Sequence, residues 1–234
     1  MNADDREKTC LPLLAELPLF RGLAQEPLRF IAGGCHQRTA PKGLVVCEKG
    51  SQLDGFFFVM SGRVKLAVLS EDGSERVLDI VLPGSSFAEA AAFLGEPCPA
   101  YAQALSESRL LYVGQQRLRE AVARWSDVAV AVVGCLARQV YDLTRDLEAC
   151  CLRSAAQRVA SYLFRAATRD GADADGGEVV LPAAKVVVAS SLDLTAETFS
   201  RELHDLVRNG IVDVERRTVR VRSLERLRLR CGVC

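Results

Sequence analysis

The chain has 234 residues, of which 49% are hydrophobic, so it has room for one large or two modest domains with a buried core. Its 30 basic and 30 acidic side chains give a net charge of zero, which by itself argues against a nucleic-acid-binding protein. No run approaches the roughly 18 apolar residues of a membrane-spanning helix, and the charged N-terminus, MNADDREKTC, lacks the apolar segment of a signal peptide. We therefore expect a cytoplasmic protein, with no membrane partner, whose nine cysteines are mostly reduced.

The first half of the chain changes from a helical to a β-like pattern. Apolar residues up to about residue 31 predict two short helices. Asp72-Gly73 is typical of a hairpin turn between two strands. Short β-like runs separated by glycines extend from Thr39 to about Tyr112: LVVC (44–47), FFFVM (56–60), RVKLAVL (63–69), RVLDIVL (76–82) and RLLYV (109–113). This pattern predicts a barrel, a roll or a sandwich.

Residues 116–151 have a helical composition, with no proline and with Gly134 as the only glycine. Apolar side chains recur there at alternating spacings of three and four: Val133, Leu136, Val140, Leu143, Leu147 and Cys150. This spacing is typical of a coiled coil and predicts a parallel homodimer. The alternative is an ordinary amphipathic helix that packs on its own domain.

Residues 186–206 predict two short helices with a tight joint between them. Thr195 suits the N-cap of the second helix, and Glu197 in its first turn complements the positive end of the helix dipole. One apolar stripe suits packing on the first helix: Phe199, Leu203 and Leu206. The opposite face presents small and polar residues near the helix N-terminus: Ala196, Glu197, Ser200 and Arg201.

A helix face of this kind can enter the major groove of DNA. Arginine can donate two hydrogen bonds to guanine, and glutamate can accept one from the cytosine amino group. We therefore assign base recognition to Glu197 and Arg201, with Thr195, Ala196 and Ser200 beside them. The alternative is a surface helix that carries an ion pair between Glu197 and Arg201.

A β-hairpin is predicted to follow this helix. Asn209-Gly210 is a turn signal, and residues 211–214 and 219–221 have the pattern of two strands around a charged tip. From residue 208 to the end, eight arginines stand against three acidic residues. Because basic patches bind phosphates, we assign phosphate contacts to Arg216 and Arg217; the alternative is a solvated surface. Together these elements predict a winged helix-turn-helix.

The order of these motifs resembles the CRP/FNR superfamily of bacterial transcription regulators. The resemblance rests on Lys42-Gly43, EKG (48–50), FFFVMSGRVKL (56–66), EDGSERVL (71–78), LPGSSFAE (82–89) and the winged helix. It implies an α+β fold in three parts: a double-stranded β-roll sensor domain like those that bind cyclic nucleotides (1–114), a dimerisation helix (115–151) and a winged helix-turn-helix DNA-binding domain (152–234). It also implies an effector-controlled homodimer that binds palindromic double-stranded DNA and acts with RNA polymerase.

The effector pocket that the resemblance implies contains Phe87, Glu89 and Tyr101. The preferred alternative for Glu89 is a structural carboxylate that bonds nearby backbone amides. In the nucleotide-binding branch, a Gly-Glu pair holds the ribose and a later Arg-Ser pair holds the cyclic phosphate. Here Ala88-Glu89 replaces the first pair, Pro99-Ala100 replaces the second, and residues 77–108 contain no arginine. Because a buried phosphate without a cation is unfavourable, we do not expect a cyclic nucleotide.

The FNR branch holds an iron–sulfur cluster on clustered cysteines. The sensor cysteines here are widely spaced, without the C-x2-C pattern typical of cluster ligands, so we expect ordinary thiols: Cys10, Cys35, Cys47 and Cys98. FAEAAAF (87–93), YAQAL (101–105) and AETFSREL (196–203) resemble the Dnr-type regulators. That group implies nitric oxide sensing through haem, control of denitrification genes and TTGAT half-sites, with His36 as the candidate haem ligand. A redox or iron–sulfur oxygen sensor of the same fold is the alternative.

An enzyme is the rival class of function. The C-x-x-C motif at residues 231–234, CGVC, suggests a thiol oxidoreductase, which requires a low pKa for Cys231. The sequence has no G-x-S-x-G, H-E-x-x-H or P-loop motif, and its two histidines leave little for acid–base catalysis. We therefore predict that the protein is not an enzyme.

Overall fold

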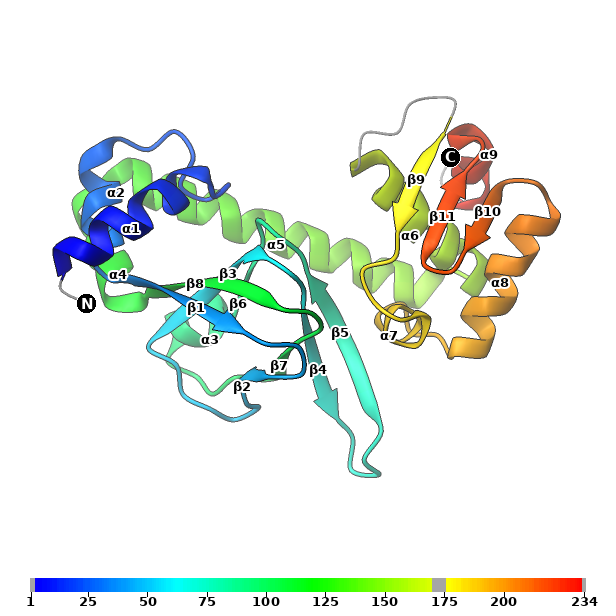
Figure 1. Cartoon of the computed structure of the whole chain (residues 1–234), viewed down its shortest axis with the longest axis horizontal. Helices are drawn as coiled ribbons and strands as arrows, with labels where there is room; N and C mark the ends of the chain where they lie inside the picture. The colour runs from blue at the N-terminus through cyan, green and yellow to red at the C-terminus, as the bar shows by residue number, and fades with distance from the viewer. Residues whose placement is uncertain (1–2, 170–175, 233–234) are drawn as a thin grey trace. The chain divides into compact units, whose positions relative to one another are not determined.

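The computed structural model describes residues 3–169 and 176–232. The chain divides into two compact units, Met1–Tyr141 and Asp142–Cys234, and each is described by itself (Figure 1). Within the described residues, no helix is both long enough and apolar enough to span a membrane.

The N-terminal unit combines two antiparallel sheets with helices (Figure 1). The first sheet has the order β1-β8-β3-β6, with β1 (Cys35–Ala40), β8 (Ser108–Gly114), β3 (Gly55–Ser61) and β6 (Ser86–Phe87). The second has the order β2-β7-β4-β5, with β2 (Val45–Cys47), β7 (Tyr101–Ala104), β4 (Val64–Leu69) and β5 (Glu75–Val81). The helices are α1 (Ala3–Glu16), α2 (Gln25–Ala32), α3 (Glu89–Leu94), α4 (Gln115–Arg124) and the first part of α5 (Ser126–Leu152). This architecture agrees with the predicted β-roll.

Strand β3 shows how the sequence supports a core on both faces of one sheet. Phe57 and Val59 belong to the apolar cluster between the two sheets, which we call the roll interior. Phe56 and Phe58 belong to a second cluster, with the helices. Side chains alternate along a strand, so a strand buried on both faces needs a continuous apolar run rather than an alternating one.

The predicted hairpin turn at Asp72-Gly73 joins β4 to β5. Gly73 has a φ of 84°, which a glycine adopts without strain. The carboxylate of Asp72 accepts hydrogen bonds from the side chain of Ser70 and from the backbone N–H (3.1 Å) and hydroxyl (2.7 Å) of Ser74. These bonds lower the pKa of Asp72 to about 2, because they favour the charged carboxylate.

The expected single helix over 115–151 is wrong in one respect, because the structure has two helices there. Helix α4 ends before Trp125, whose backbone is extended (φ −126°, ψ 116°), and α5 begins at Ser126. The Trp125 ring packs on Phe30 with the centroids 5.5 Å apart. Composition alone did not reveal this break, because no proline or glycine marks it.

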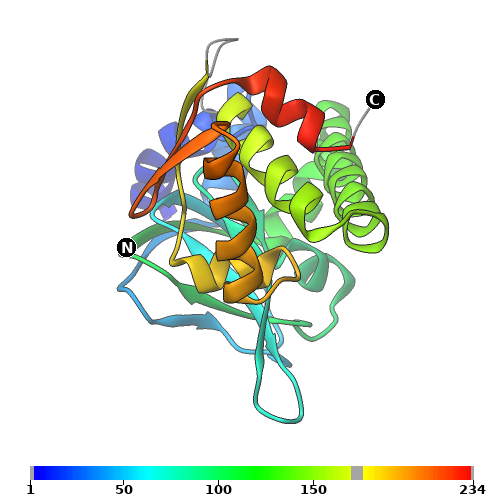
Figure 2. The ribbon, with the colours of Figure 1, turned by 90° about the vertical axis from the view of Figure 1, so that its right-hand side faces the viewer.

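The C-terminal unit is a small three-stranded sheet with helices (Figure 2). After α6 (Ala155–Arg169) come β9 (Gly177–Val180), α7 (Lys185–Ser191) and α8 (Ala196–Arg208). The hairpin β10 (Val212–Glu215) and β11 (Thr218–Val221) follows, and the sheet order is β10-β11-β9. A last helix that the sequence reading did not predict, α9 (Leu224–Arg230), contacts α6. The predicted helix-turn-helix and wing are therefore both present.

Candidate DNA-binding surface and sensor core

Helix α8 begins at a capped N-terminus. The hydroxyl oxygen of Thr195 accepts a hydrogen bond from the backbone N–H of Thr198 at 3.1 Å, as predicted. Glu197 lies in the first turn, where its negative charge complements the helix dipole. The start of the helix is thus fixed by local sequence.

The two faces of α8 differ as the spacing predicts. Phe199, Leu203 and Leu206 are buried, and the helix contacts α6, α7 and β10. The opposite face of its first two turns presents Glu197 and Ser200, both exposed. This arrangement anchors the helix by one stripe and leaves polar groups of the other face accessible.

Arg201 completes the exposed face, and its side chain is 61% exposed. Its guanidinium lies 3.3 Å from the carboxylate of Glu202, so Arg201 pairs with its neighbour rather than with Glu197 as the alternative interpretation proposed. The Arg201 end of this pair is exposed to water, which weakens the attraction. Arg201 can therefore exchange this partner for a nucleic-acid base at little cost, beside the half-buried Ala196.

The turn between α7 and α8 is held by an arginine that sequence reasoning missed. Arg158 of α6 donates to the backbone oxygens of Leu192 at 2.9 Å and Asp193 at 3.1 Å. It also lies 3.3 Å from the carboxylate of Asp193. Asp193 has a φ of 58°, a conformation that aspartate tolerates better than most residues. Arg158 thereby fixes the joint that orients α8.

The tip of the wing is a two-residue turn formed by Arg216 and Arg217, because Glu215 pairs directly with Thr218. Arg216 has a φ of 54°, and both arginines are exposed. Within the described residues, neither forms an ion pair. The two predicted phosphate contacts therefore stand together at the end of the hairpin, with their charges uncompensated.

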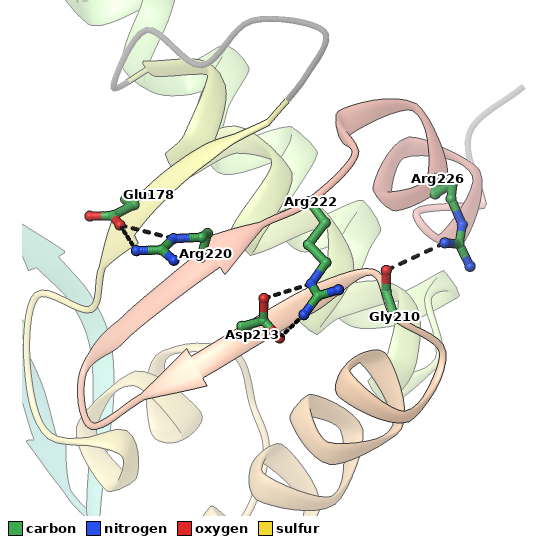
Figure 3. A network of polar contacts seen from close by, with 6 residues as sticks. All are labelled: Glu178, Gly210, Asp213, Arg220, Arg222 and Arg226. Carbon is green, nitrogen blue, oxygen red and sulfur yellow. Dashed lines mark hydrogen bonds and ion pairs between the residues drawn. The ribbon is translucent and has the colours of Figure 1, made fainter.

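Other arginines of the basic C-terminal region hold the wing together (Figure 3). Arg222 binds the carboxylate of Asp213 with two hydrogen bonds of 2.6 and 2.8 Å, and Arg220 binds Glu178 with bonds of 2.7 and 3.1 Å. The bonds from Arg222 lower the pKa of Asp213. Arg226 donates to two backbone oxygens just beyond α8, those of Asn209 (2.7 Å) and Gly210 (3.3 Å).

In the sensor, Glu89 is buried at the start of α3. Its carboxylate accepts a hydrogen bond from Ser86 at 3.0 Å and another from the side-chain amide of Gln139 on α5. Ala88 before it has a φ of 68°, in the left-handed region. Glu89 therefore connects α3 to α5 through a side-chain hydrogen bond.

A small cavity of about 20 Å³ lies beside this contact, lined by residues of the roll, α3, α4 and α5. That volume suffices for about one water molecule. Glu89 and Cys135 are among its lining residues. Burial, followed by the negative charge of Glu89, raises the pKa of the Cys135 thiol.

The structure does not bring the three predicted pocket residues together. Phe87 lies in the roll interior, stacked on Phe57 with the centroids 5.2 Å apart. The hydroxyl of Tyr101 instead donates to Glu75, which accepts a 2.5 Å bond from Lys65. Only Glu89 among the three lines the small cavity. The predicted grouping is wrong because Tyr101 points to the outer face of β7, whereas Ala102 points inward.

A cation that sequence reasoning missed lies on the inner side of β1. Arg38 pairs in register with Leu110 of the roll interior, so the two side chains share a face. Its guanidinium lies 6.0 Å from the Phe57 ring centroid and donates to the backbone oxygen of Val46 at 3.3 Å. The candidate haem ligand His36 lies on the same side of β1, with its ring 4.5 Å from that of Tyr112.

The four sensor cysteines fall into two separate pairs. Cys10 and Cys35 lie among the helices. Burial raises the pKa of Cys35, and the neighbouring Cys10 thiol raises it further. Cys47 and Cys98 lie in the roll interior, where burial and the neighbouring Cys98 thiol raise the pKa of Cys47 to about 12. No group of three metal-ligating side chains occurs within residues 3–169 and 176–232.

The C-terminal thiol does not suit redox catalysis. Cys231 is buried and donates to the backbone oxygen of Leu227 at 3.3 Å, and burial raises its pKa. The thiol oxidoreductase hypothesis required a lowered pKa and is wrong on this point. Its second cysteine, Cys234, lies outside the described residues.

The predicted dimerisation seam on α5 is exposed in the single chain. Its four most exposed members are Val133, Val140, Leu143 and Leu147, and a fifth, Leu136, is partly covered where it lines the small cavity. The side chain of the sixth, Cys150, lies outside the described residues. Large apolar side chains in such a row favour association with a partner surface.

Two family models match the chain. One, described as a cyclic nucleotide-binding domain, matches residues 37–124, and the other, described as a Crp-like helix-turn-helix domain, matches residues 157–230. The CRP-like cAMP-activated global transcriptional regulator of Mycobacterium tuberculosis is 25% identical over 216 residues, which are 92% of this chain and 96% of that protein. The nitrogen fixation regulation protein FixK of Rhizobium meliloti is 27% identical over 195 residues, covering 83% of this chain and 86% of that protein.

The structure of FixK2 from Bradyrhizobium japonicum is similar to this chain with a TM-score of 0.76 and 23% sequence identity. The match covers 86% of this chain and 98% of that chain. At this level of identity, the similarity establishes the fold alone.

Proposed function

Because this chain is a DNA-binding transcription regulator of the CRP/FNR superfamily and not an enzyme, we propose that it binds a palindromic DNA site as a homodimer. In the proposed complex α8 enters the major groove, and the tip of the wing contacts phosphates. Two copies then present their α8 helices to half-sites one turn of DNA apart, roughly 34–36 Å. RNA polymerase is the proposed protein partner at the promoter.

One observation carries this proposal: α8 is capped and anchored along one stripe, while Glu197, Ser200 and Arg201 stay exposed on the other face. A TTGAT half-site contains a single G·C pair. Arg201 can donate two hydrogen bonds to that guanine, and Glu197 can accept one from the amino group of the paired cytosine. The two residues thus suit recognition of one base pair.

The decisive experiment is Arg201→Ala, with binding measured by fluorescence anisotropy on three duplexes. They carry two TTGAT half-sites, the same sites with each G·C pair replaced by A·T, or a random sequence. We expect the variant to lose about 1–3 kcal/mol on the first duplex, which is about 5- to 150-fold in affinity. It should lose little on the other two.

Arg216→Ala is the matched control, since it removes the same charge from the wing. It should weaken binding to all three duplexes alike and reduce the slope of log K against log salt by about one. Equal losses on all duplexes for Arg201→Ala would show that Arg201 contacts only phosphates. No preference of the wild-type protein for TTGAT would refute the proposed half-site.

We further propose that the effector acts where the roll, α3 and α5 meet. Glu89 links α3 to Gln139 on α5 there. The Gln139→Leu variant removes this link and should change the DNA affinity of the effector-free protein. Gln116→Leu, at an exposed glutamine of α4, is the control. If Gln139→Leu leaves the DNA affinity unchanged, the bond between Glu89 and Gln139 does not couple the effector site to DNA binding.

A nitric oxide response through haem, with control of denitrification genes, is a second proposal that rests on the Dnr-type motifs. His36 fits a haem ligand poorly in this conformation, because its ring packs on Tyr112 and does not line the small cavity beside Glu89. An absorption spectrum of protein from haem-supplied cells tests it. A Soret band that shifts with nitric oxide and disappears in His36→Ala supports this second proposal, and a colourless protein refutes it. An air-sensitive thiolate-to-iron band points instead to an iron–sulfur cluster.

A further inference from the structure

An open cleft of about 490 Å³ lies in the N-terminal unit. Helices α1, α2 and α4 form its walls, and the rings of Phe30 and Trp125 line it. The volume is typical of sites for small organic molecules. None of the predicted effector residues lines this cleft.

Two guanidinium groups in the cleft share one aromatic ring. The Cζ atoms of Arg117 and Arg124 lie 4.6 and 4.7 Å from the Phe30 ring centroid, respectively. In the described part of the chain, neither arginine forms an ion pair. The third arginine of the cleft, Arg29, lies 3.9 Å from the carboxylate of Glu7. The two guanidinium groups without an ion-pair partner among the described residues are therefore the two that contact the Phe30 ring.

The acidic side chains leave the positive charge of the cleft in excess. Among the described side chains, Glu7 and Glu26 are the acids that line the cleft, and Glu7 is already paired with Arg29. Both guanidiniums contact the same ring, so an anion held beside Phe30 is attracted by both charges. Each guanidinium is also a planar fork that matches a carboxylate or phosphate.

Trp125 adds a flat apolar surface beside the charges, with its ring centroid 5.5 Å from that of Phe30. Aromatic rings prefer stacked or edge-to-face neighbours at such distances. We propose that this cleft binds a small aromatic anion, a planar ring that carries a carboxylate or phosphate group. The ring packs against Trp125, and the anionic group bridges Arg117 and Arg124. This site shares no lining residue with the Glu89 cavity.

Gly33 offers a way to close the cleft without changing its charge. It ends α2 with a φ of −62°, which any residue can adopt. A Cβ atom there would lie 3.6 Å from the backbone oxygen of Phe30 and 4.0 Å from Cζ of Arg117, both ordinary contacts. The Gly33→Leu variant should therefore fold normally and narrow the cleft beside Arg117.

The chain provides its own reporter, because Trp125 is the only tryptophan. We would titrate the full-length protein with four probes and follow tryptophan fluorescence. Benzoate and adenosine monophosphate combine a ring with a carboxylate or a phosphate. Benzamide has a ring without a charge, and inorganic phosphate has a charge without a ring. We expect a saturable change with benzoate or adenosine monophosphate only, and added salt should weaken it because both arginines are exposed.

Variants then test the geometry. Arg117→Ala and Arg124→Ala should each weaken binding about tenfold, and Gly33→Leu should abolish it although both arginines remain. Arg21→Ala, at an exposed arginine outside the cleft, should bind like the wild-type protein. Circular dichroism and DNA binding confirm that each variant is folded.

Three results would overturn the proposal. One is the absence of any saturable change with either aromatic anion up to about 10 mM, where even a millimolar ligand saturates most of its site. Another is wild-type affinity in the Gly33→Leu variant. The third is an equal response to phosphate alone, which would mean general attraction of anions to a basic surface. Because the readout does not involve DNA, such a failure would leave the DNA-binding proposal untouched.

Discussion

Leu143→Ala tests the proposed dimer most directly. Leu143 lies in the middle of the α5 seam and is 69% exposed in the single chain. Full burial of a leucine side chain contributes about 1.5–3 kcal/mol, so burial of the exposed two thirds contributes about 1–2 kcal/mol. A symmetric dimer contains two copies, and the variant should therefore lose about 2–4 kcal/mol of association free energy. The dissociation constant should rise about 30- to 700-fold.

Sedimentation equilibrium over a dilution series measures this constant for both proteins. Leu94→Ala is the matched control, because Leu94 is 75% exposed at the end of α3 and is not a member of the predicted seam. We expect this control to leave the constant unchanged. Equal constants for Leu143→Ala and the wild-type protein would refute the argument from exposed area. So would an equal weakening by Leu94→Ala, which would indicate a different interface.

Four further predictions concern stability and can be checked by denaturation of the full-length protein. Ala88→Gly should raise the free energy of unfolding by about 1 kcal/mol, because glycine adopts the left-handed conformation without strain. Thr195→Ala should lower the free energy of unfolding by about 1 kcal/mol through loss of the N-cap, whereas Thr195→Ser should retain most of the stability that the cap provides. Arg158→Met should lower it by about 2–3 kcal/mol and weaken specific DNA binding, because the turn loses charge-assisted hydrogen bonds; wild-type DNA affinity would contradict its orienting role. Since Arg222 lowers the pKa of Asp213, their pair stabilises the wing above about pH 4, the unfolded value, and this contribution disappears as the pH falls through the lower folded value. Asp213→Asn should therefore be less stable than the wild-type protein at neutral pH, and the difference should vanish in acid.

The DNA-binding half was largely predictable because its signals are local. The cap at Thr195 and the stripe headed by Phe199 lie within one helix, and each was found where it was predicted. Arg158 was missed because it precedes the turn that it holds by more than 30 residues. The basic C-terminal region was also expected to be free for phosphate contacts as a whole, but Arg220 and Arg222 form ion pairs within the wing sheet. A charge count along the sequence cannot separate charges that hold the fold from charges available to DNA.

The sensor half was less predictable because its site depends on which strands pair. Strand β1 (CHQRTA) is mostly polar, and strand β7 (YAQA) is short, so neither was recognised as a strand. Their existence depends on pairing with β8 and β4, which periodicity cannot show. As a result, a cation that could bind a phosphate was expected only within residues 77–108, although the fold brings Arg38 to the roll interior from β1.

The contact between Glu89 and Gln139 has a consequence for how any effector could act. Glu89 is buried, and Ser86 and Gln139 both donate to the same oxygen of its carboxylate. An effector hydroxyl that takes this oxygen must compete with Gln139, because one oxygen accommodates only a few donors. Gln139 belongs to α5, so the competition would release one restraint on the proposed dimerisation helix. The effector would then shift the population of states by the difference between the bond it makes and the bond it replaces. Such an exchange between hydrogen bonds is nearly balanced in free energy, which is the condition for a switch that a modest ligand can reverse.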